Sequence, residues 1–292
     1  MIDLHIHTNY SDGADTLIDV LKKAQERKLE YISITDHDNC NVYTELSKID
    51  VAQYFDGVII PGIEIKCGYQ GRLIEILGYK INTKKMQEWT NEFYKDKTKP
   101  ILQQKYFDIL YDKCLNANLI MRPKAEVEFD SNKDWASVTI FNEIKKHVEN
   151  ISKLPDDFLQ DFNTFSKKYC GNKNGYWFID KTKDYPTIQE AITAIKECNG
   201  LVFLPHLFIY KWSENIEQMI EDILHNYSID GIECMHSEFN QKQIDYLIDL
   251  CNKRGYYVSG GSDYHGVNKP NIEMEVGKGN LQIEKRLIED WI

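Results

Sequence analysis

The sequence has no apolar run approaching the ~20 residues needed to cross a bilayer, so we expect no membrane partner. Its first five residues, MIDLH, contain no basic region, apolar stretch or cleavage site, and we expect no secretory signal. The 7 cysteines form no C-x-x-C pair and are odd in number, which is unlike a disulfide framework. Together these absences predict a cytoplasmic protein.

Positive charge is also scarce, because 35 Lys and Arg stand against 46 Asp and Glu and give a formal charge of -11. A chain this acidic lacks the basic face that duplex nucleic acid requires, so we expect no duplex DNA partner. An acidic chain can still bind an anionic substrate if positive charge is concentrated at the binding site, and bound metal ions are the most compact way to do so.

Short apolar runs alternate with amphipathic stretches near both ends of the chain. Strands are predicted at 2–6, 31–35, 58–61, 201–204, 229–235 and 256–259, with a hairpin of runs at 64–68 and 72–79. Helices are predicted at 16–28, 216–224 and 244–251, and a T-x-x-E capping box at Thr187 and Glu190 begins another. Strand followed by helix, repeated, predicts an α/β fold whose parallel sheet or barrel is covered by helices.

The middle of the chain has a different composition. Between about residues 83 and 185 it is rich in Lys, Asn and aromatic residues, with helical spacing and few strand-like runs. We interpret 83–185 as a mostly helical insertion, which interrupts an α/β domain made of 1–82 and 186–292.

Side chains that bind metals follow the predicted strands at their carboxyl ends, where barrels and open α/β sheets place active sites. His5 and His7 share one face of the first strand, roughly 6.6 Å apart at ~3.3 Å per residue, so both imidazoles can reach one ion. Five of the 8 histidines fall at such ends, a coincidence of register that a purely structural role does not explain. The candidate ligands are His5, His7, Asp12, His37, Glu64, Glu75, His206, Asp263 and His265.

This set combines imidazoles with carboxylates and contains no cysteine, which suits Zn, Mn or Fe(II). Nine ligands exceed the needs of one ion, so we expect two or three divalent metal ions. Ions ~3.5–4 Å apart lower the pKa of a bound water toward ~7 and hold the attacking and leaving oxygens of a phosphoester. The sequence shows neither a nucleophile elbow nor a Walker-type phosphate loop. It therefore does not support a covalent mechanism or the binding of nucleotide phosphates by a glycine-rich loop.

Five segments resemble the motifs of the polymerase-and-histidinol-phosphatase (PHP) superfamily, in the order of the family. They are Asp3-Leu4-His5-Ile6-His7-Thr8 with Ser11-Asp12-Gly13; Thr35-Asp36-His37-Asp38; Pro61-Gly62-Ile63-Glu64-Ile65; Pro205-His206; and Gly261-Ser262-Asp263-Tyr264-His265-Gly266. The first motif is most similar to that of stand-alone phosphoesterases acting on nucleotides. The resemblance implies a distorted (β/α)7 TIM-like barrel of seven strands, with a helical insertion and a trinuclear metal site.

The resemblance also implies an activity, the hydrolysis of phosphomonoesters through a metal-bound hydroxide. Members of that branch act on nucleoside monophosphates or 3',5'-bisphosphates, and some trim RNA from the 5' end. A small phosphorylated substrate, a nucleotide or short single-stranded RNA is therefore expected. One ion would be held by His5, His7, Glu64 and Asp263, a second by Glu64, Glu75 and His206, and a third by Asp12, His37 and His265.

Two positions depart from the family pattern. Relatives commonly have His on the hairpin strand where this sequence has Glu75, a harder donor that adds negative charge and favours Mn or Fe. Relatives that act on nucleotides tend to have His where Phe239 follows the Gly231-Ile232-Glu233 strand, and His236 is a candidate substitute.

Further residues have candidate roles around the metals. His206 and His236 are candidates to protonate the leaving oxygen, and Asp36 is expected to orient His37 or cap the following helix. Additional phosphate contacts are expected from Arg122, Lys66 and Lys269, and Arg122 is favoured because a guanidinium binds phosphate through two parallel hydrogen bonds. Candidates to stack on a base are Tyr169, Tyr176, Trp177 and Phe178, although packing of the insertion explains them more simply.

Two other functions fit parts of the pattern. Barrels of amidohydrolase-type C–N hydrolases also begin with H-x-H and end with a strand-borne Asp, but the Asp-His pair after the second strand fits them poorly. The other alternative is a non-catalytic binding module that keeps its metals for stability. The many charges converging on one site weigh against it. The sequence leaves the substrate, the metal and the oligomeric state open.

Overall fold

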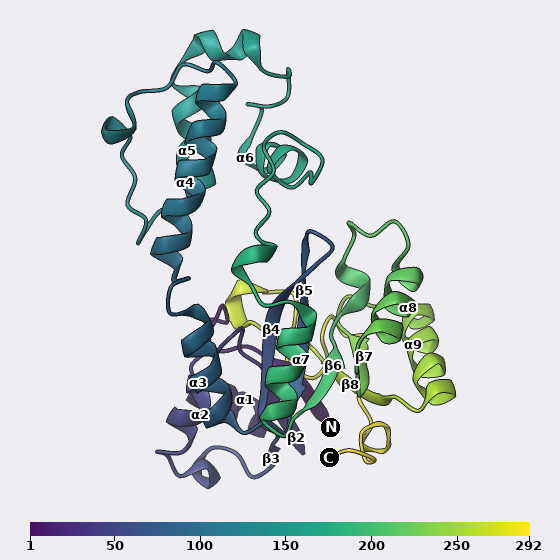
Figure 1. Ribbon diagram of the computed structural model, residues 1–292. Helices are drawn as coiled ribbons and strands as arrows, with labels where there is room; N and C mark the ends of the chain where they lie inside the picture. Colours follow the sequence, from purple (N-terminus) through teal and green to yellow (C-terminus); the bar gives the residue numbers. More distant parts are fainter. The chain divides into compact units, whose positions relative to one another are not determined.

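The computed structural model describes residues 1–292, and its strands form two sheets (Figure 1). The parallel sheet β1-β2-β3 consists of β1 (Ile2–Ile6), β2 (Tyr31–Ile34) and β3 (Val58–Ile59). The sheet β4-β5-β6-β7-β8 consists of β4 (Gly62–Tyr69), β5 (Arg72–Tyr79), β6 (Leu201–Leu204), β7 (Gly231–His236) and β8 (Tyr257–Gly261). β1, β5 and β6 have the bounds that their apolar runs predict, whereas β3 is only 2 residues long.

The contacts divide the chain into two compact units. The first contains residues 1–69, 73–92 and 185–292, and the second, called the insertion unit below, contains 70–72 and 93–184. Residues 83–92, which the sequence assigned to the insertion, thus pack with the α/β unit.

Helices of the first unit bury their apolar sides against the sheets. They are α1 (Leu17–Glu26), α2 (Asn41–Leu46), α3 (Thr83–Tyr94), α7 (Ile188–Glu197), α8 (Ile216–Asn226) and α9 (Gln241–Arg254). Capping boxes begin α1 at Thr16 and α7 at Thr187, because each hydroxyl accepts the backbone N–H three residues on. α7 packs on β4 and β6, and α9 packs on β7 and β8.

The two sheets meet at isolated parallel bridges, between Ile6 and Tyr264 and between His37 and Glu64. They do not close into the expected continuous barrel of seven strands, since there are eight strands in two sheets and β5 runs antiparallel to β6. Beside both bridges, Asp38 and Asp263 adopt left-handed backbone conformations, with φ of 51° and 59°. A mixed α/β fold is therefore what the structure shows.

The insertion unit has its own hydrophobic core, built around α4 (Lys99–Asn116), α5 (Ala136–Lys145) and the short α6 (Phe162–Thr164). α4 packs along α5. Trp177 is buried, and its ring centroid lies 5.1 Å from that of Phe158, while Tyr169 also contacts Phe158 at 4.6 Å. Packing thus accounts for both of these aromatic side chains, whereas Tyr176 is half exposed.

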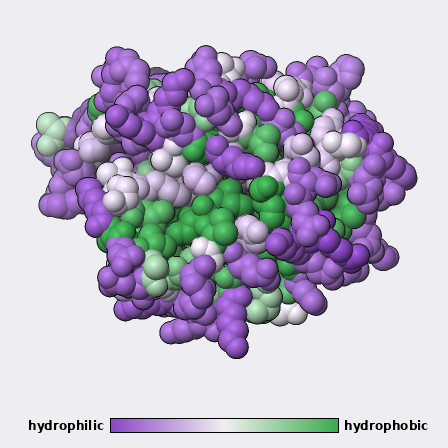
Figure 2. All heavy atoms as spheres, turned by 90° about the horizontal axis from the view of Figure 1, so that it is seen from below, coloured by the Kyte–Doolittle hydropathy of each residue, from purple (hydrophilic) through white to green (hydrophobic).

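The amino ends of β1, β2 and β3 lie near both chain termini, at the lower end of Figure 1. Trp291 covers part of the core there, with its ring centroid 4.8 Å from Phe203 and its indole N–H donating to Val258 O. Figure 2 views the molecule from this end and shows a hydrophobic area across the middle of a largely hydrophilic surface. No helix is both long enough and apolar enough to span a membrane.

Candidate metal centre

β1 places two histidines side by side at its carboxyl end. All of β1 is buried, and the Nε2 atoms of His5 and His7 lie 3.1 Å apart. His5 donates from Nδ1 to Glu233 Oε1 at 2.8 Å, which leaves the lone pair of its Nε2 facing His7. The two nitrogens are therefore placed either to share one proton or to bind one ion.

Three groups of side chains bring their ligand atoms within 4.8 Å of one another. They are His5 with His7 and Glu64; His37 with Glu64 and Glu75; and His7 with Asp12, His37 and His265. Each group shares members with the others, since Glu64, His7 and His37 belong to two groups each. The three groups therefore form one continuous cluster of candidate ligands.

Glu64, at the start of β4, lies at the centre of this cluster. Its Oε2 is 3.3, 3.2 and 3.1 Å from the nearest ring nitrogens of His5, His7 and His37. Its Oε1 is 2.6 Å from His206 Nε2, and the residue is 1% exposed. One carboxylate thus lies among four imidazoles.

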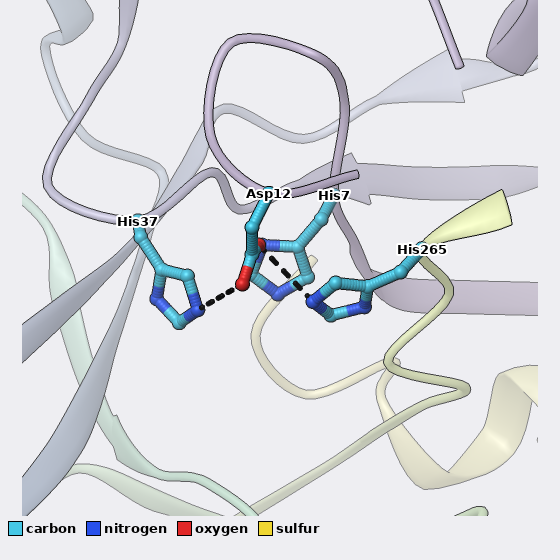
Figure 3. A group of neighbouring side chains, drawn as sticks. All are labelled: His7, Asp12, His37 and His265. Atoms are coloured by element: carbon cyan, nitrogen blue, oxygen red, sulfur yellow. Dashed lines mark ion pairs between the residues drawn. The ribbon is translucent and has the colours of Figure 1, made fainter. Parts of the chain in front are cut away.

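Asp12, on the loop after β1, projects between His37 and His265 with His7 behind it (Figure 3). Its Oδ1 is 3.1 Å from His265 Nε2, and its Oδ2 is 3.6 Å from His37 Nε2. The loop can pass this close to β1 because Gly13 has no side chain, since a Cβ there would lie 2.4 Å from His7 O. The side chain of Asp12 is 55% exposed while His7 is buried, so solvent reaches the cluster at Asp12.

The remaining expected ligands lie in the same cluster. Asp263 Oδ1 is 3.7 and 3.4 Å from the Nε2 atoms of His5 and His7. Glu75 Oε2 is 3.3 Å from His206 Nε2, and Glu75 Oε1 is 3.7 Å from His37 Nδ1. All nine candidates thus lie in one cluster, but Asp263 and His206 belong to none of the three groups of ligand atoms, and His37 instead of His206 joins Glu64 and Glu75.

Charge and burial shift the pKa values within the cluster in opposite directions. Burial opposes protonation of His7, yet hydrogen bonds to Asp263 and Glu64 raise its pKa to about 9. Burial lowers the pKa of His37 to about 3. Burial, together with the charge of Glu64, raises the pKa of Glu75 to about 7. Without metal, the cluster therefore retains protons at neutral pH that a metal ion would have to displace.

We expect metal affinity to rise with pH across the neutral range. His7 must lose its proton before Nε2 binds an ion, so its raised pKa disfavours binding below about pH 9. For each group that must lose a proton, the metal affinity falls by up to about tenfold for every pH unit below the pKa of that group. Calorimetric titration with Mn²⁺ in buffers of different ionisation enthalpy should show proton release at pH 7. An affinity that is the same at pH 6 and pH 8 would contradict this assignment.

Glu233, on β7, is buried and contacts two of the candidate ligands without belonging to any of the three groups. Its Oε1 accepts from His5 Nδ1, and its Oε2 accepts from the backbone N–H of His206 at 2.8 Å. That second bond helps to hold His206 in a left-handed conformation with φ of 30°.

Replacement of Glu233 by glutamine is expected to weaken metal binding roughly 10- to 100-fold, the usual effect of losing an outer hydrogen-bond partner of a metal ligand. A glutamine side chain accepts at one end only, so either His5 or His206 loses its acceptor. Metal content after dialysis, together with competition by a chelator, measures the effect. The matched control is Glu238→Gln, because Glu238 is a part-exposed acid paired with Lys278 outside the cluster. Equal metal retention by both variants would show that Glu233 has no positioning role.

Asp36 has a different role from the one expected of it. Its carboxylate accepts from Thr8 N at 2.8 Å, Thr8 Oγ1 at 2.6 Å and Ser11 Oγ at 2.5 Å. It does not cap the next helix, because the residue at the start of α2 is Cys40. Asp36 orients the loop that carries Asp12, whereas the sequence suggested His37 as its target.

His236 faces the cluster as a hydrogen-bond donor. Its Nδ1 accepts the backbone N–H of Glu238, so in the neutral ring Nε2 carries the proton. That Nε2 lies 3.5 Å from Asp263 Oδ2 and has no hydrogen-bond partner. Phe239, where relatives have His, is buried and packs on His236 with ring centroids 5.2 Å apart.

Two of the three predicted phosphate contacts lie beside the ligands. Lys269 Nζ is 2.5 Å from Asp263 Oδ2, and Lys66 Nζ is 3.9 Å from Glu75 Oε1. Arg122 belongs to the insertion unit, where its Nε and Nη2 donate to the two carboxylate oxygens of Glu143 at 2.9 and 2.8 Å. This bond lowers the pKa of Glu143 to about 2 and occupies much of the guanidinium.

Sequence reasoning gave no role to Asp3, which the structure makes a support of the site. Its carboxylate accepts from Ser262 N at 2.9 Å, from Ser262 Oγ at 2.6 Å and from Glu275 N at 2.7 Å. These bonds fix the end of β8 immediately before Asp263. The available signal was an acidic residue within a short, fully buried strand.

The donor set fits divalent metal ions on the evidence of the structure itself. The buried Nδ1 atoms of His37 and His206 have no hydrogen-bond partner, although buried polar atoms almost always have one. Imidazole nitrogens and carboxylate oxygens without thiolates suit Mn, Fe or Zn. These residues could therefore hold ions of this class.

Comparisons with known proteins agree with this chemistry. The chain is 24% identical over 268 residues to a phosphoribosyl 1,2-cyclic phosphate 1,2-diphosphodiesterase of Eggerthella lenta, covering 90% of this chain and 94% of the relative. It is 25% identical over 295 residues to a 5'-3' exoribonuclease of Haemophilus influenzae, covering 99% and 97%. It is 23% identical over 272 residues to a 3',5'-nucleoside bisphosphate phosphatase of Chromobacterium violaceum, covering 90% and 87%.

Solved structures share the fold. A protein of Bifidobacterium adolescentis assigned to the metal-dependent phosphoesterases superposes with a TM-score of 0.63 at 17% identity, covering 99% of this chain and 94% of the other. An amidohydrolase of Chromobacterium violaceum, with bound sulfate and no metal, superposes with a TM-score of 0.61 at 18% identity, covering 92% and 88%. The sequence pattern of the PHP domain matches residues 3–276, nearly the whole chain, and this chain therefore belongs to the PHP domain family.

Proposed function

We propose that the protein is a metal-dependent phosphoesterase that hydrolyses phosphomonoesters. The observation that carries this proposal is the shared cluster of five imidazoles and four carboxylates, in which Glu64 belongs to two groups of ligands. Such a donor set suits two or three ions of Mn, Fe or Zn close together. The two lysines beside it supply further positive charge for an anionic substrate.

The substrate class is inferred from the relatives. Their names specify a cyclic phosphate of phosphoribose, RNA and a nucleoside bisphosphate, all of which contain a phosphate ester of ribose. We infer that this chain acts on the same class, with nucleotides, 3',5'-bisphosphates and RNA 5' ends as candidates. We also infer that its two sheets, joined through both bridges, form a distorted version of the family's barrel.

The chain's own side chains position and protonate the substrate. Divalent ions held by the nine ligands would supply an activated water and neutralise the phosphate charge. The phosphoryl group enters beside the exposed Asp12, where Lys66 and Lys269 hold its outer oxygens. His236 donates its Nε2 proton to the leaving oxygen, because that N–H faces the cluster without a partner.

An activity panel tests the proposal. The purified chain is loaded in turn with Mn²⁺, Fe²⁺ and Zn²⁺, its metal content is measured, and phosphate release is followed from nucleoside monophosphates, 3',5'-bisphosphates and 5'-phosphorylated RNA. We expect release with at least one metal. Metal-loaded protein that hydrolyses only C–N bonds would favour the amidohydrolase alternative. Metal-loaded protein that hydrolyses nothing would favour the non-catalytic module.

A further inference from the structure

Tyr210 lies beside two members of the metal cluster, although it is not a candidate ligand itself. It follows the single turn Leu207–Ile209, which begins immediately after His206 at the carboxyl end of β6. The ring centroids of Tyr210 and His206 are 5.7 Å apart, and the Tyr210 hydroxyl oxygen lies 2.9 Å from the backbone nitrogen of Glu75. Only 7% of Tyr210 is exposed, so its hydroxyl lies in the protein interior next to the cluster.

Part of the hydrogen bonding of this hydroxyl has a structural explanation. The pairing of β5 with β6 ends at Leu77 and Phe203 and does not extend to Glu75. The backbone N–H of Glu75 therefore donates to the Tyr210 oxygen instead of to a neighbouring strand. A hydroxyl that accepts one hydrogen bond still has a proton to donate, so this contact does not account for the Tyr210 proton.

The proton of the Tyr210 hydroxyl has no acceptor in the chain, which distinguishes this residue from five other buried tyrosines. Each of those donates to a carbonyl or carboxylate oxygen: Tyr43 to Ile34 O, Tyr79 to Leu4 O, Tyr106 to Asp184, Tyr111 to Arg122 O and Tyr264 to Asp15. Buried polar groups almost always have a hydrogen-bond partner. An unpaired donor at this place indicates an acceptor that binds at the cluster.

The surroundings of Glu75 favour an anionic oxygen as that acceptor. Lys66 Nζ lies 3.9 Å from Glu75 Oε1, so a charged donor and the neutral Tyr210 hydroxyl both lie next to Glu75. The side chain of Glu75 is 17% exposed, so solvent reaches this part of the cluster. A phosphoryl group has several strongly accepting oxygens, and hydrogen bonds to charged oxygens are stronger than those between neutral groups.

We propose that Tyr210 is a catalytic residue, which donates a hydrogen bond from its hydroxyl to a non-bridging oxygen of the bound phosphoryl group. The hydroxyl keeps its proton throughout the reaction, and its dipole stabilises the negative charge of the phosphoryl oxygens. This inference rests on the proposed phosphoesterase function. It adds to that function a residue that contacts the substrate without being a metal ligand.

The affinity of Mn²⁺-saturated protein for inorganic phosphate, measured by calorimetric titration, tests this role. We expect Tyr210→Phe to weaken phosphate binding roughly ten- to a hundredfold, the usual effect of losing a hydrogen bond to a charged group. The value of kcat/KM for a phosphomonoester should fall by a similar factor. Metal content and melting temperature are measured on the same samples, because a purely structural role would change these and leave the phosphate affinity of metal-saturated protein unchanged.

Tyr43→Phe is the matched control, because Tyr43 is also buried and its hydroxyl also accepts a backbone N–H, that of Gly62 at the start of β4. The proton of Tyr43 is already accepted by Ile34 O, so it is not free to bind a ligand. We expect Tyr43→Phe to lower the melting temperature at least as much as Tyr210→Phe does, and to bind phosphate like the unchanged protein. Equal phosphate affinities in Tyr210→Phe and the unchanged protein would overturn the assignment, as would an equal loss in Tyr43→Phe or no phosphate binding by the unchanged protein.

A crystal structure of the unchanged, metal-loaded protein with phosphate provides a second measurement that needs no variant. We expect Tyr210 Oη within about 3 Å of a phosphate oxygen. A phosphate bound at the cluster without contact to this hydroxyl would contradict the proposal. Both measurements use phosphate itself, so they decide the role of Tyr210 even if no ester is hydrolysed, and failure of either proposal is recognised separately.

Discussion

Replacing Glu64 by glutamine should reduce phosphomonoester turnover roughly a thousandfold or more, which corresponds to about 4 kcal/mol of lost transition-state stabilisation. The carboxylate contacts four imidazoles within 3.3 Å and is a member of two of the three ligand groups. Glutamine preserves the shape of the side chain but removes the charge with which Glu64 would bridge two cations. Measurements of kcat/KM and of metal bound per chain should show both quantities fall.

The control for this substitution is Glu26→Gln, which changes an exposed acid at the end of α1 that belongs to none of the groups of ligands. It should leave turnover and metal content unchanged. Because the variant could also lose activity by unfolding, the melting temperature and circular dichroism of Glu64→Gln are measured in parallel. A folded Glu64→Gln protein that keeps its metals and more than a tenth of its turnover would refute the bridging role.

Removal of the metals should abolish turnover. It should also lower the melting temperature by roughly 8–16 °C, compared with protein in which the metal concentration is a thousand times the dissociation constant. A ligand at that excess stabilises the native state by about 4 kcal/mol, and each kcal/mol shifts Tm by roughly 2–4 °C in a domain of 150–250 residues. The structural cause is the burial of His5, His7 and Glu64, whose charges are compensated most fully when ions lie among them.

Calorimetry of chelated and reloaded protein measures this shift, and reloading should restore both the melting temperature and the turnover. The same chelation applied to Glu64→Gln should shift its melting temperature less, since that variant holds less metal. If the chelated protein melts at the original temperature and still releases phosphate, the cluster is not a metal centre that supports catalysis.

The positions of the ligands could be predicted because they follow from local patterns. Strand periodicity alone predicts that His5 and His7 lie on the same face of a strand. The usual place of active sites in α/β folds predicts that residues at strand ends come together, and these residues include His37, Glu64 and Asp263. The bounds of β1, β5 and β6 followed from the same apolar periodicities, and the start of α7 followed from a capping box, which involves residues three apart.

The partners of the supporting residues could not be predicted, because these contacts join residues far apart in the chain. His5 and Glu233 are 228 residues apart, and Asp3 and Ser262 are 259 apart. The partners of Asp36 were predicted incorrectly, because its carboxylate oxygens have several donors within reach and the sequence does not say which of them they contact. The pairing of Arg122 with Glu143 likewise depends on how two helical segments pack, which periodicity does not specify.

The sequence by itself determined which side chains are available to bind metals and on which elements they lie, because short-range periodicity sets element type and facing. Only the tertiary structure decided how those ligands group, that Glu64 is shared between groups, and that the sheets meet at two bridges instead of closing. The reason is that grouping depends on distances between strands, and these are set by packing and backbone geometry, including the left-handed conformations of Asp38 and Asp263.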